Sequence, residues 1–298
     1  MKVIIIGDVV GKPGRDALTA SLKRLRDQHE AEFVIANVEN AAEGAGVIPR
    51  VGDEILAAGV DVMTSGNHIF DKKEVIKYIE NQPRLLRPAN YAPDAPGKGL
   101  WLGSTDSGTP VAVINIQGRV FMPPTDCPFR TADRLLEEIG GRASVVIVDH
   151  HAEATSEKQA MGRYLDGRVS AVVGTHTHVQ TADEQVLAGG TAYITDLGMT
   201  GPYDSVIGVE SQLVITRFVR GLPIRYQTAT KDARLCGVVV EIDERTGNSV
   251  SISRLIKTFV PNNNSSGTVA TWNNTFKISV VIRMVFHHHG KAFYIGVG

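Results

Sequence analysis

Short runs of apolar, mostly β-branched residues alternate along the chain with longer stretches in which apolar positions recur at helical spacing. The short runs predict buried strands at residues 3–6, 33–35, 60–63, 111–116, 145–148 and 171–173. The longer stretches predict helices at residues 15–29, 49–58, 72–80, 131–139 and 156–165. This alternation is typical of an α/β fold in which helices cover the sheets.

The second half of the chain has a different pattern, with shorter strand-like runs at residues 185–187 and 191–195. Residues 235–257 have the pattern of two strands joined by the turn Glu244-Arg245-Thr246-Gly247-Asn248. We therefore predict a mixed α/β (α+β) fold, a two-sheet sandwich flanked by helices, over residues 1–257. Residues 258–298 continue none of these patterns and contain a linker-like stretch, so we interpret them as an appendage.

Composition limits the compartment and the partners. The 298 residues are 43% hydrophobic and 21% charged, which is ordinary for a globular protein, and the net charge is -1. Such a charge gives no general attraction for a nucleic-acid backbone, so we expect no stable nucleic-acid complex. Two cysteines, no signal-peptide pattern and no long apolar segment predict a cytoplasmic protein that does not bind membranes. The pattern leaves open whether the protein is a homo-oligomer.

Potential metal ligands follow five of the predicted strands. In chain order they are Asp8, Glu39 with Asn40, Asn67 with His68, His150 with His151, and His176 with His178. Because the carboxyl ends of parallel strands meet at one edge of a sheet, we expect these side chains to converge. Oxygen and imidazole ligands without thiolates suit iron, manganese or zinc, and their number exceeds what one ion requires. Glu39 could bridge two ions.

Each of these residues also has an ordinary structural explanation. Asp8 could cap a helix, Asn40 could occupy a turn, and a histidine pair could lie on the surface. Five strand ends that all carry such residues make a metal site the better interpretation. The most specific segment is Gly174-Thr175-His176-Thr177-His178, because in an extended segment His176 and His178 point to the same side.

Five motifs resemble, in the same order, those of the calcineurin-like metallophosphoesterase superfamily. They are Gly7-Asp8, Asn37-Val38-Glu39-Asn40, Gly66-Asn67-His68, His150-His151-Ala152-Glu153 and Gly174-Thr175-His176-Thr177-His178. Many members have a histidine at the position of Val10 and an aspartate at that of Glu39. At both positions the chain resembles instead the YmdB-like branch of bacterial cyclic-nucleotide phosphodiesterases. The resemblance covers about residues 1–257 and implies a metallophosphoesterase-type sandwich.

The resemblance also implies a set of ligands and a reaction. One metal ion would be bound by Asp8, Glu39, Asn40 and His178, and a second by Glu39, Asn67, His151 and His176. His151 is chosen because it directly precedes Ala152-Glu153, and His150 is expected to be a buried neighbour. The implied activity is that of a metal-dependent phosphoric diester hydrolase with iron or manganese, or zinc. Its substrates would be 2',3'-cyclic nucleotides and 3',5'-cyclic AMP.

We expect a hydroxide that bridges the two ions to attack phosphorus while His68 donates a proton to the leaving oxygen. The other role open to His68 is to support a ligand by a hydrogen bond. Two other functions remain open, namely a phosphomonoesterase or protein phosphatase on the same centre, and a metal-dependent nucleotide-binding regulatory protein with little turnover. Tyr203, Phe121 and Phe129 are candidates for stacking on a base, and each could equally be a packing residue.

Overall fold

The computed structural model describes residues 1–259. The appendage predicted at residues 258–298 therefore lies outside the described residues, apart from its first two positions. The predicted domain boundary at residue 257 falls next to the last residue of the final strand, β13 (Ser249–Thr258).

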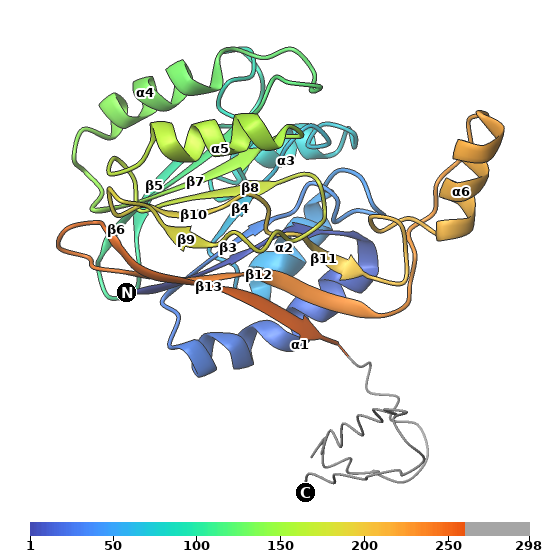
Figure 1. The fold of residues 1–298 in the computed structure, drawn as a ribbon, viewed down its shortest axis with the longest axis horizontal. Coiled ribbons are helices and arrows are strands. Elements are labelled where there is room, and N and C mark those ends of the chain that lie inside the picture. Colours follow the sequence, from blue (N-terminus) through green and yellow to red (C-terminus); the bar gives the residue numbers. More distant parts are fainter. Residues whose placement is uncertain (260–298) are drawn as a thin grey trace, which may run out of the picture. The chain divides into compact units, whose positions relative to one another are not determined.

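Two mixed sheets lie face to face (Figure 1). The first has the order β2-β11-β12-β1-β3-β4, with β13 beside β12. Its other strands are β1 (Lys2–Ile6), β2 (Asp8–Val9), β3 (Phe33–Asn37), β4 (Val62–Thr64), β11 (Met199–Pro202) and β12 (Ala233–Ile242). The second has the order β5-β6-β7-β8-β10-β9. Its strands are β5 (Leu100–Ser104), β6 (Pro110–Gln117), β7 (Val145–His151), β8 (Ala171–Thr175), β9 (Gln185–Val186) and β10 (Ala192–Ile194).

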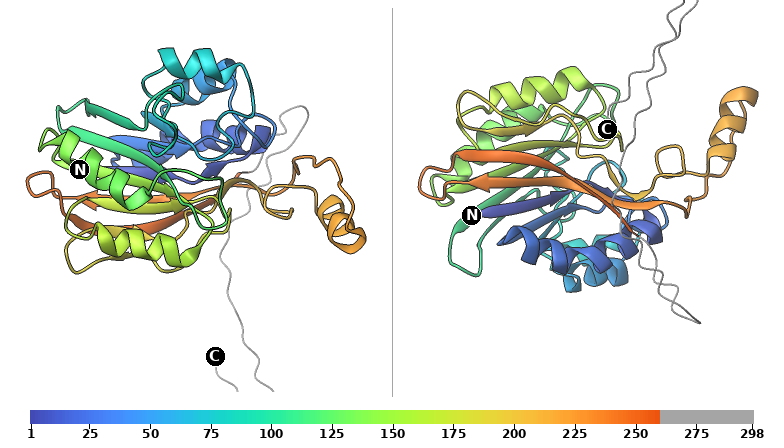
Figure 2. Two further views of the ribbon diagram at one scale, coloured as in Figure 1. Left: turned by 90° about the horizontal axis from the view of Figure 1, so that it is seen from above. Right: turned by 60° about the horizontal axis from the view of Figure 1, so that its bottom comes forward.

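Helices cover the outer face of each sheet, so the described chain forms four layers (Figures 1 and 2). The first sheet is covered by α1 (Gly11–His29), α2 (Pro49–Ala57) and α3 (Val75–Asn81), and the second by α4 (Pro128–Ile139) and α5 (Thr155–Tyr164). A sixth helix, α6 (Ser211–Arg220), stands away from both sheets on a protruding segment. Within residues 1–259, no helix has the length and apolar character needed to cross a bilayer.

The alternation of side chains along β1 explains why its sequence is apolar throughout. Val3 and Ile5 pack into the core between the two sheets, whereas Ile4 and Ile6 pack into the core beneath α1. All four are almost completely buried. A strand that is covered on both faces has no solvent side and needs no polar positions. The continuous apolar runs that predicted strands are therefore those at the centre of the sandwich.

The predicted two-sheet sandwich with flanking helices is confirmed, with shifts at the ends of elements. α1 begins at Gly11 rather than at residue 15, because Pro13 is tolerated in a first turn whose backbone N–H groups have no partner within the helix. The predicted turn after β12 is present, where the Gly247 N–H donates to the Asp243 carbonyl at 2.8 Å. Gly247 has a φ of 77°, which glycine adopts without strain.

Among the elements that were not predicted from the sequence are β5, β11 and α6. β5 is an edge strand whose side chains are only partly buried, and its apolar run Leu100-Trp101-Leu102 is only three residues long. β11 contains Gly201 and Pro202, two residue types that are depleted in strands. α6 contains Val214 and Ile215, whose β-branched side chains favour strands over helices.

The direction of the strands fixes the location of the site. In the first sheet β1, β3 and β4 run parallel, and in the second β6, β7 and β8 run parallel. Parallel strands present their carboxyl ends at a common edge, where the connecting loops begin.

Candidate metal centre

All the candidate ligands lie at the carboxyl ends of parallel strands. Asp8 is two residues beyond β1, Glu39 and Asn40 follow β3, Asn67 and His68 follow β4, His151 is the last residue of β7, and His176 and His178 follow β8. The structure brings seven of these side chains into two groups of donor atoms. We name them the His151 group (Glu39, Asn67, His151 and His176) and the His178 group (Asp8, Asn40 and His178).

The donor atoms of the His151 group surround one ring nitrogen. His151 Nε2 lies 3.1 Å from Glu39 Oε1, 3.0 Å from Asn67 Oδ1 and 3.1 Å from His176 Nδ1. Glu39, His151 and His176 each offer an atom within 4.8 Å of the others. Two imidazole nitrogens, a carboxylate oxygen and an amide oxygen are a donor set that fits a divalent cation.

The His178 group is more widely spaced. His178 Nε2 lies 3.3 Å from Asn40 Oδ1 and 3.9 Å from Asp8 Oδ1. Asp8 is completely buried, and its Oδ1 has no hydrogen-bond partner within residues 1–259. A buried carboxylate oxygen without a partner is costly, and a bound cation would compensate for that cost. The residues present therefore fit a metal ion here as well.

Burial and neighbouring charges shift the ionisation of these groups. Burial raises the pKa of Asp8 to about 6. Burial also opposes ionisation of Glu39, but the adjacent His151 outweighs it and lowers the pKa of Glu39 to about 2. The pKa of His151 rises to about 9, because the charge of Glu39 outweighs the opposing effect of burial. Since ligands bind a metal ion in their deprotonated form, a cation bound at Glu39 would compete with the proton on His151.

A chain of buried hydrogen bonds sets which nitrogen of His151 faces the centre. The Thr175 hydroxyl donates to Asp149 Oδ1 at 2.7 Å and lies 2.9 Å from His151 Nδ1. Because the hydroxyl has a single proton, it accepts from His151 Nδ1–H, which leaves Nε2 toward the centre. Asp149 Oδ2 also accepts hydrogen bonds from Thr64 and Asn37, so four strand ends meet at this carboxylate.

The other two histidines are oriented in a similar way. His178 Nδ1 donates to the backbone carbonyl of Ile207 at 2.9 Å, and His176 Nε2 lies 3.1 Å from a carboxylate oxygen of Glu153. Each ring therefore presents its remaining nitrogen to the other candidate ligands. Of the supporting residues, Asp149 and Ile207 were not singled out in the sequence, although Asp149 directly precedes His150-His151.

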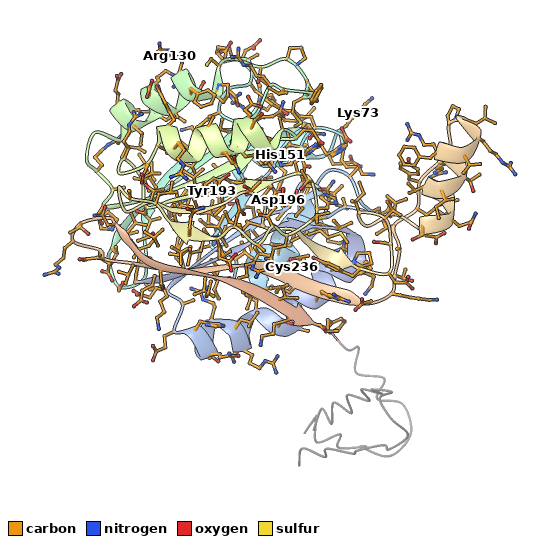
Figure 3. All side chains as sticks on the ribbon, in the orientation of Figure 1. Lys73, Arg130, His151, Tyr193, Asp196 and Cys236 are labelled. Carbon is orange, nitrogen blue, oxygen red and sulfur yellow. The ribbon has the colours of Figure 1, made fainter. Side chains whose placement is uncertain are left out.

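His176 and His178 do not lie in the extended segment that the sequence predicted. β8 ends at Thr175, and His176 and His178 have φ values of 102° and 67°, so the segment is not extended and strand alternation does not apply. The Thr177 amide and hydroxyl instead donate to Asp196 Oδ2, at 3.2 and 2.8 Å. Buried Asp196, itself paired with Lys158 at 2.6 Å, holds the turn near His151 (Figure 3).

His150 and His68 lie outside both groups. His150 is completely buried, and neither ring nitrogen has a hydrogen-bond partner in residues 1–259. Its burial lowers the pKa to about 3, so the ring is neutral. The ring of His68 is 40% exposed, with Nδ1 2.7 Å from Asp71 Oδ2, while its backbone N–H donates to Glu39 Oε2 at 2.9 Å. His68 thus lies at the rim of the centre.

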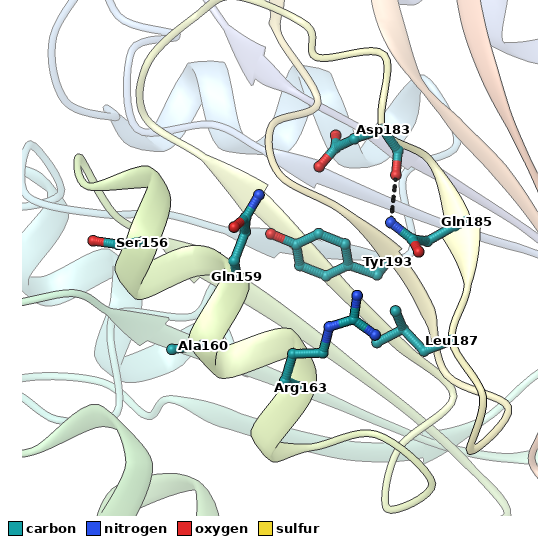
Figure 4. A pocket seen from close by; sticks show the side chains of 8 residues that line it. All are labelled: Ser156, Gln159, Ala160, Arg163, Asp183, Gln185, Leu187 and Tyr193. Atoms are coloured by element: carbon teal, nitrogen blue, oxygen red, sulfur yellow. Dashed lines mark hydrogen bonds between the residues drawn. The ribbon is translucent and has the colours of Figure 1, made fainter.

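A cavity of about 380 Å³ lies elsewhere, between α5 and the segment around β9 (Figure 4). Its lining includes Gln159, Arg163, Asp183 and Tyr193. None of the candidate ligands lines it, so this cavity is separate from the metal centre.

The four-layer sandwich and the oxygen–imidazole centre at its strand ends define a protein of the metallophosphoesterase type. Residues 4–255 match the family model described as YmdB-like protein, and the chain belongs to this family. The predicted family and fold class are thereby confirmed. The family implies divalent metal ions, but it does not identify the metal.

Known relatives are similar over nearly all of the described chain. The 2',3'-cyclic-nucleotide 2'-phosphodiesterase of Bacillus subtilis (strain 168) is 48% identical over 256 residues, covering 86% of this chain and 97% of its own. A crystal structure of a hypothetical protein from Thermus thermophilus is 44% identical, with a TM-score of 0.82 over 87% of this chain and 99% of that one. A novel phosphatase from Mycoplasma pneumoniae is 33% identical, also with a TM-score of 0.82, over 87% and 93%. The predicted enzyme class is that of a phosphoric diester hydrolase, and the name of the Bacillus subtilis relative agrees with it.

Proposed function

We propose that the chain is a dinuclear-metal phosphodiesterase that hydrolyses small phosphodiesters, with 2',3'-cyclic nucleotides as its main substrates and 3',5'-cyclic AMP as a second. The observation that carries the proposal is the convergence of seven donor side chains in two groups, one of which contains a buried Asp8 oxygen without a hydrogen-bond partner within the described residues. The activity for which the Bacillus subtilis relative is named supports the substrate class.

The proposed ligands divide between two ions. Asp8, Glu39, Asn40 and His178 hold one, and Glu39, Asn67, His151 and His176 hold the other. The donor set suits iron or manganese, and zinc is the alternative. When bound, the ions supply an activated water as nucleophile and positive charge that stabilises the phosphate in the transition state. The protein's own contribution is to orient each ligand, as Thr175, Ile207 and Glu153 do for the three histidines.

His68 is proposed as the proton donor to the leaving oxygen. Its Nδ1 is engaged by Asp71, so Nε2 is the nitrogen left for a substrate. Its backbone N–H is bonded to Glu39, which fixes the residue next to the centre without making it a ligand. A donor of this kind typically contributes on the order of a hundredfold to ten-thousandfold to the rate.

The test compares two leaving groups in His68→Ala. Hydrolysis of 2',3'-cyclic AMP expels an alkoxide that needs a proton, and we expect kcat to fall by about 10²–10⁴-fold. Hydrolysis of bis(p-nitrophenyl) phosphate expels a stable phenolate, and we expect it to change little. Metal content by plasma mass spectrometry should stay at the wild-type value. Equal losses on both substrates, or full activity on the cyclic nucleotide, would refute the role of His68.

A substrate panel separates the proposal from its alternatives. The enzyme, loaded with manganese or iron, is assayed on cyclic nucleotides, nucleoside monophosphates and phosphopeptides. Preferred hydrolysis of monoesters would replace the proposal by a phosphomonoesterase or protein phosphatase. Tight nucleotide binding without turnover would indicate a regulatory binding protein. A cytoplasmic location and the absence of a stable nucleic-acid complex remain predictions from composition.

A further inference from the structure

Three aromatic side chains are candidates for stacking on a base, and the structure separates them. The ring of Phe129 packs edge-on against Tyr164, with 5.3 Å between ring centroids. The ring of Tyr203 is covered by Arg234 at 4.7 Å, and its hydroxyl lies 2.8 Å from Cys236 Sγ. The side chain of Phe121 is 88% exposed. Of the three, Phe121 alone is exposed, whereas Phe129 and Tyr203 are half-buried.

Phe121 lies on a loop that leaves the sheet at the metal centre. The loop begins after β6, whose last residue pairs with His151 on β7. The Gly118 N–H donates to the carbonyl of His151 at 2.9 Å, so the loop starts against a candidate ligand. Phe121 is three residues further along, which places its backbone within about 11 Å of Gly118. The loop that carries Phe121 therefore starts at the strand end that presents His151 to the centre.

The loop is fixed by buried polar groups rather than by packing of Phe121. The carboxylate of Glu157, which is itself buried, accepts hydrogen bonds from the backbone N–H groups of Arg119 at 3.0 Å and Val120 at 3.1 Å. Near the far end of the loop, Asn90 Nδ2 donates to the Thr125 hydroxyl at 2.9 Å. The backbone around Phe121 is thus anchored on both sides.

The backbone conformation of Phe121 is itself costly. Its φ of 60° lies in the left-handed region, which bulky side chains rarely adopt. An outlier of this kind persists where the surrounding structure imposes it, and it is commonest at ligand-binding sites. Here Glu157 holds the backbone of the two preceding residues, and the large apolar ring of Phe121 is left in solvent.

We propose that Phe121 stacks on the base of the nucleotide substrate, an inference that rests on the proposed function. Stacking on an aromatic face tolerates every base, so Phe121 would select for nucleotides over other cyclic phosphodiesters without selecting strongly among bases. Loss of one stacked base typically weakens binding by on the order of tenfold to a hundredfold.

The test uses a substrate with a base and one without. KM and kcat are measured for 2',3'-cyclic AMP and for glycerol 1,2-cyclic phosphate in the wild type, Phe121→Ala and Phe121→Trp. Val120→Ala, on the same loop, is the control. We expect Phe121→Ala to raise KM for the nucleotide by about tenfold to a hundredfold, with little change in kcat or in either constant for the baseless substrate. Phe121→Trp keeps an aromatic ring at this position and should have a KM for the nucleotide close to that of the wild type.

A second measurement gives the same contrast from binding alone. Inhibition by adenosine 3'-monophosphate should weaken in Phe121→Ala, whereas inhibition by inorganic phosphate should not. If Phe121→Ala changes neither inhibition constant, or weakens both ligands equally, the stacking role is wrong while the phosphodiesterase proposal stands. If the metal-loaded wild type hydrolyses no cyclic phosphodiester, the proposed function fails first, and the inference fails with it.

Discussion

The His151 group and the His178 group hold their donor atoms in different ways. In the His151 group three donor atoms lie within 3.1 Å of His151 Nε2. The other ring nitrogen, Nδ1, is hydrogen-bonded to buried Thr175, which is in turn bonded to buried Asp149. In the His178 group the corresponding distances are 3.3 and 3.9 Å. There the ring is fixed by the carbonyl of Ile207, whose side chain is 52% exposed.

Two metal sites in one centre can differ in affinity for this reason. Donor atoms that are already close and supported by buried hydrogen bonds lose little freedom when a cation binds. In the His178 group the His178 ring is held by an exposed residue and lies farther from its partners, so these donor atoms must be brought together at binding. We therefore expect the His151 group to bind its cation more tightly than the His178 group.

Glu39→Gln should have the largest effect, because Glu39 is proposed to bridge both ions. Loss of its charge removes several kcal/mol of metal-dependent stabilisation, and we expect activity on 2',3'-cyclic AMP to fall by on the order of a thousandfold or more. Metal content by plasma mass spectrometry should fall below one ion per chain. Glu80→Gln, an exposed site on α3, is the matched control. A Glu39→Gln variant with two ions and near-normal activity would show that Glu39 is not shared.

His178→Ala should separate the two groups. We expect the variant to retain one cation per chain in the His151 group and to lose on the order of a hundredfold to a thousandfold in activity, since the second ion is absent. Titration calorimetry with manganese gives the stoichiometry, and His29→Ala, at the end of α1, is the control. Stoichiometry that remains at two, or that falls to zero, contradicts the assignment of His178 to its own ion.

Thr175→Val should have a smaller effect that is confined to the His151 group. Valine has nearly the shape of threonine but cannot accept the His151 Nδ1–H bond, and loss of such a support typically costs about tenfold to a hundredfold in metal affinity. Thr175→Ser keeps the hydroxyl and should retain affinity close to that of the wild type. The measurement is competition with a chelator of known affinity. If both variants bind metal equally, the hydroxyl does not orient His151.

Much of the fold could be predicted from the sequence, because β1 and its parallel neighbours are buried on both faces and leave a clear apolar signal. The elements at the edges of the sheets and outside them could not be predicted. β5 lies at an edge, and β11 contains Gly201 and Pro202, so neither has the composition of a central strand. α6 buries only Val214, and its run Leu213-Val214-Ile215 has the composition of a strand.

The candidate ligands could be predicted because they follow recognisable strands. The hydrogen bonds that orient these ligands could not be predicted. The bond from Thr175 to Asp149 joins β8 to β7, and that from Asn37 joins the two sheets. Such pairs depend on which strand ends meet in space, which no local spacing reveals. The sequence predicted that His176 and His178 converge because they would alternate along an extended segment. In the structure they lie in a turn that Asp196 holds, and a turn of this kind has no periodic pattern in the sequence.

The most direct test of a shared two-metal centre is anomalous scattering from crystals of the protein grown with excess manganese and no chelator. We expect two peaks of anomalous density at the carboxyl edge of the strands, one within the His151 group and one within the His178 group, with Glu39 contacting both. An edge without anomalous density, or with these side chains turned away from one another, would contradict the two-metal centre and the phosphodiesterase proposal with it.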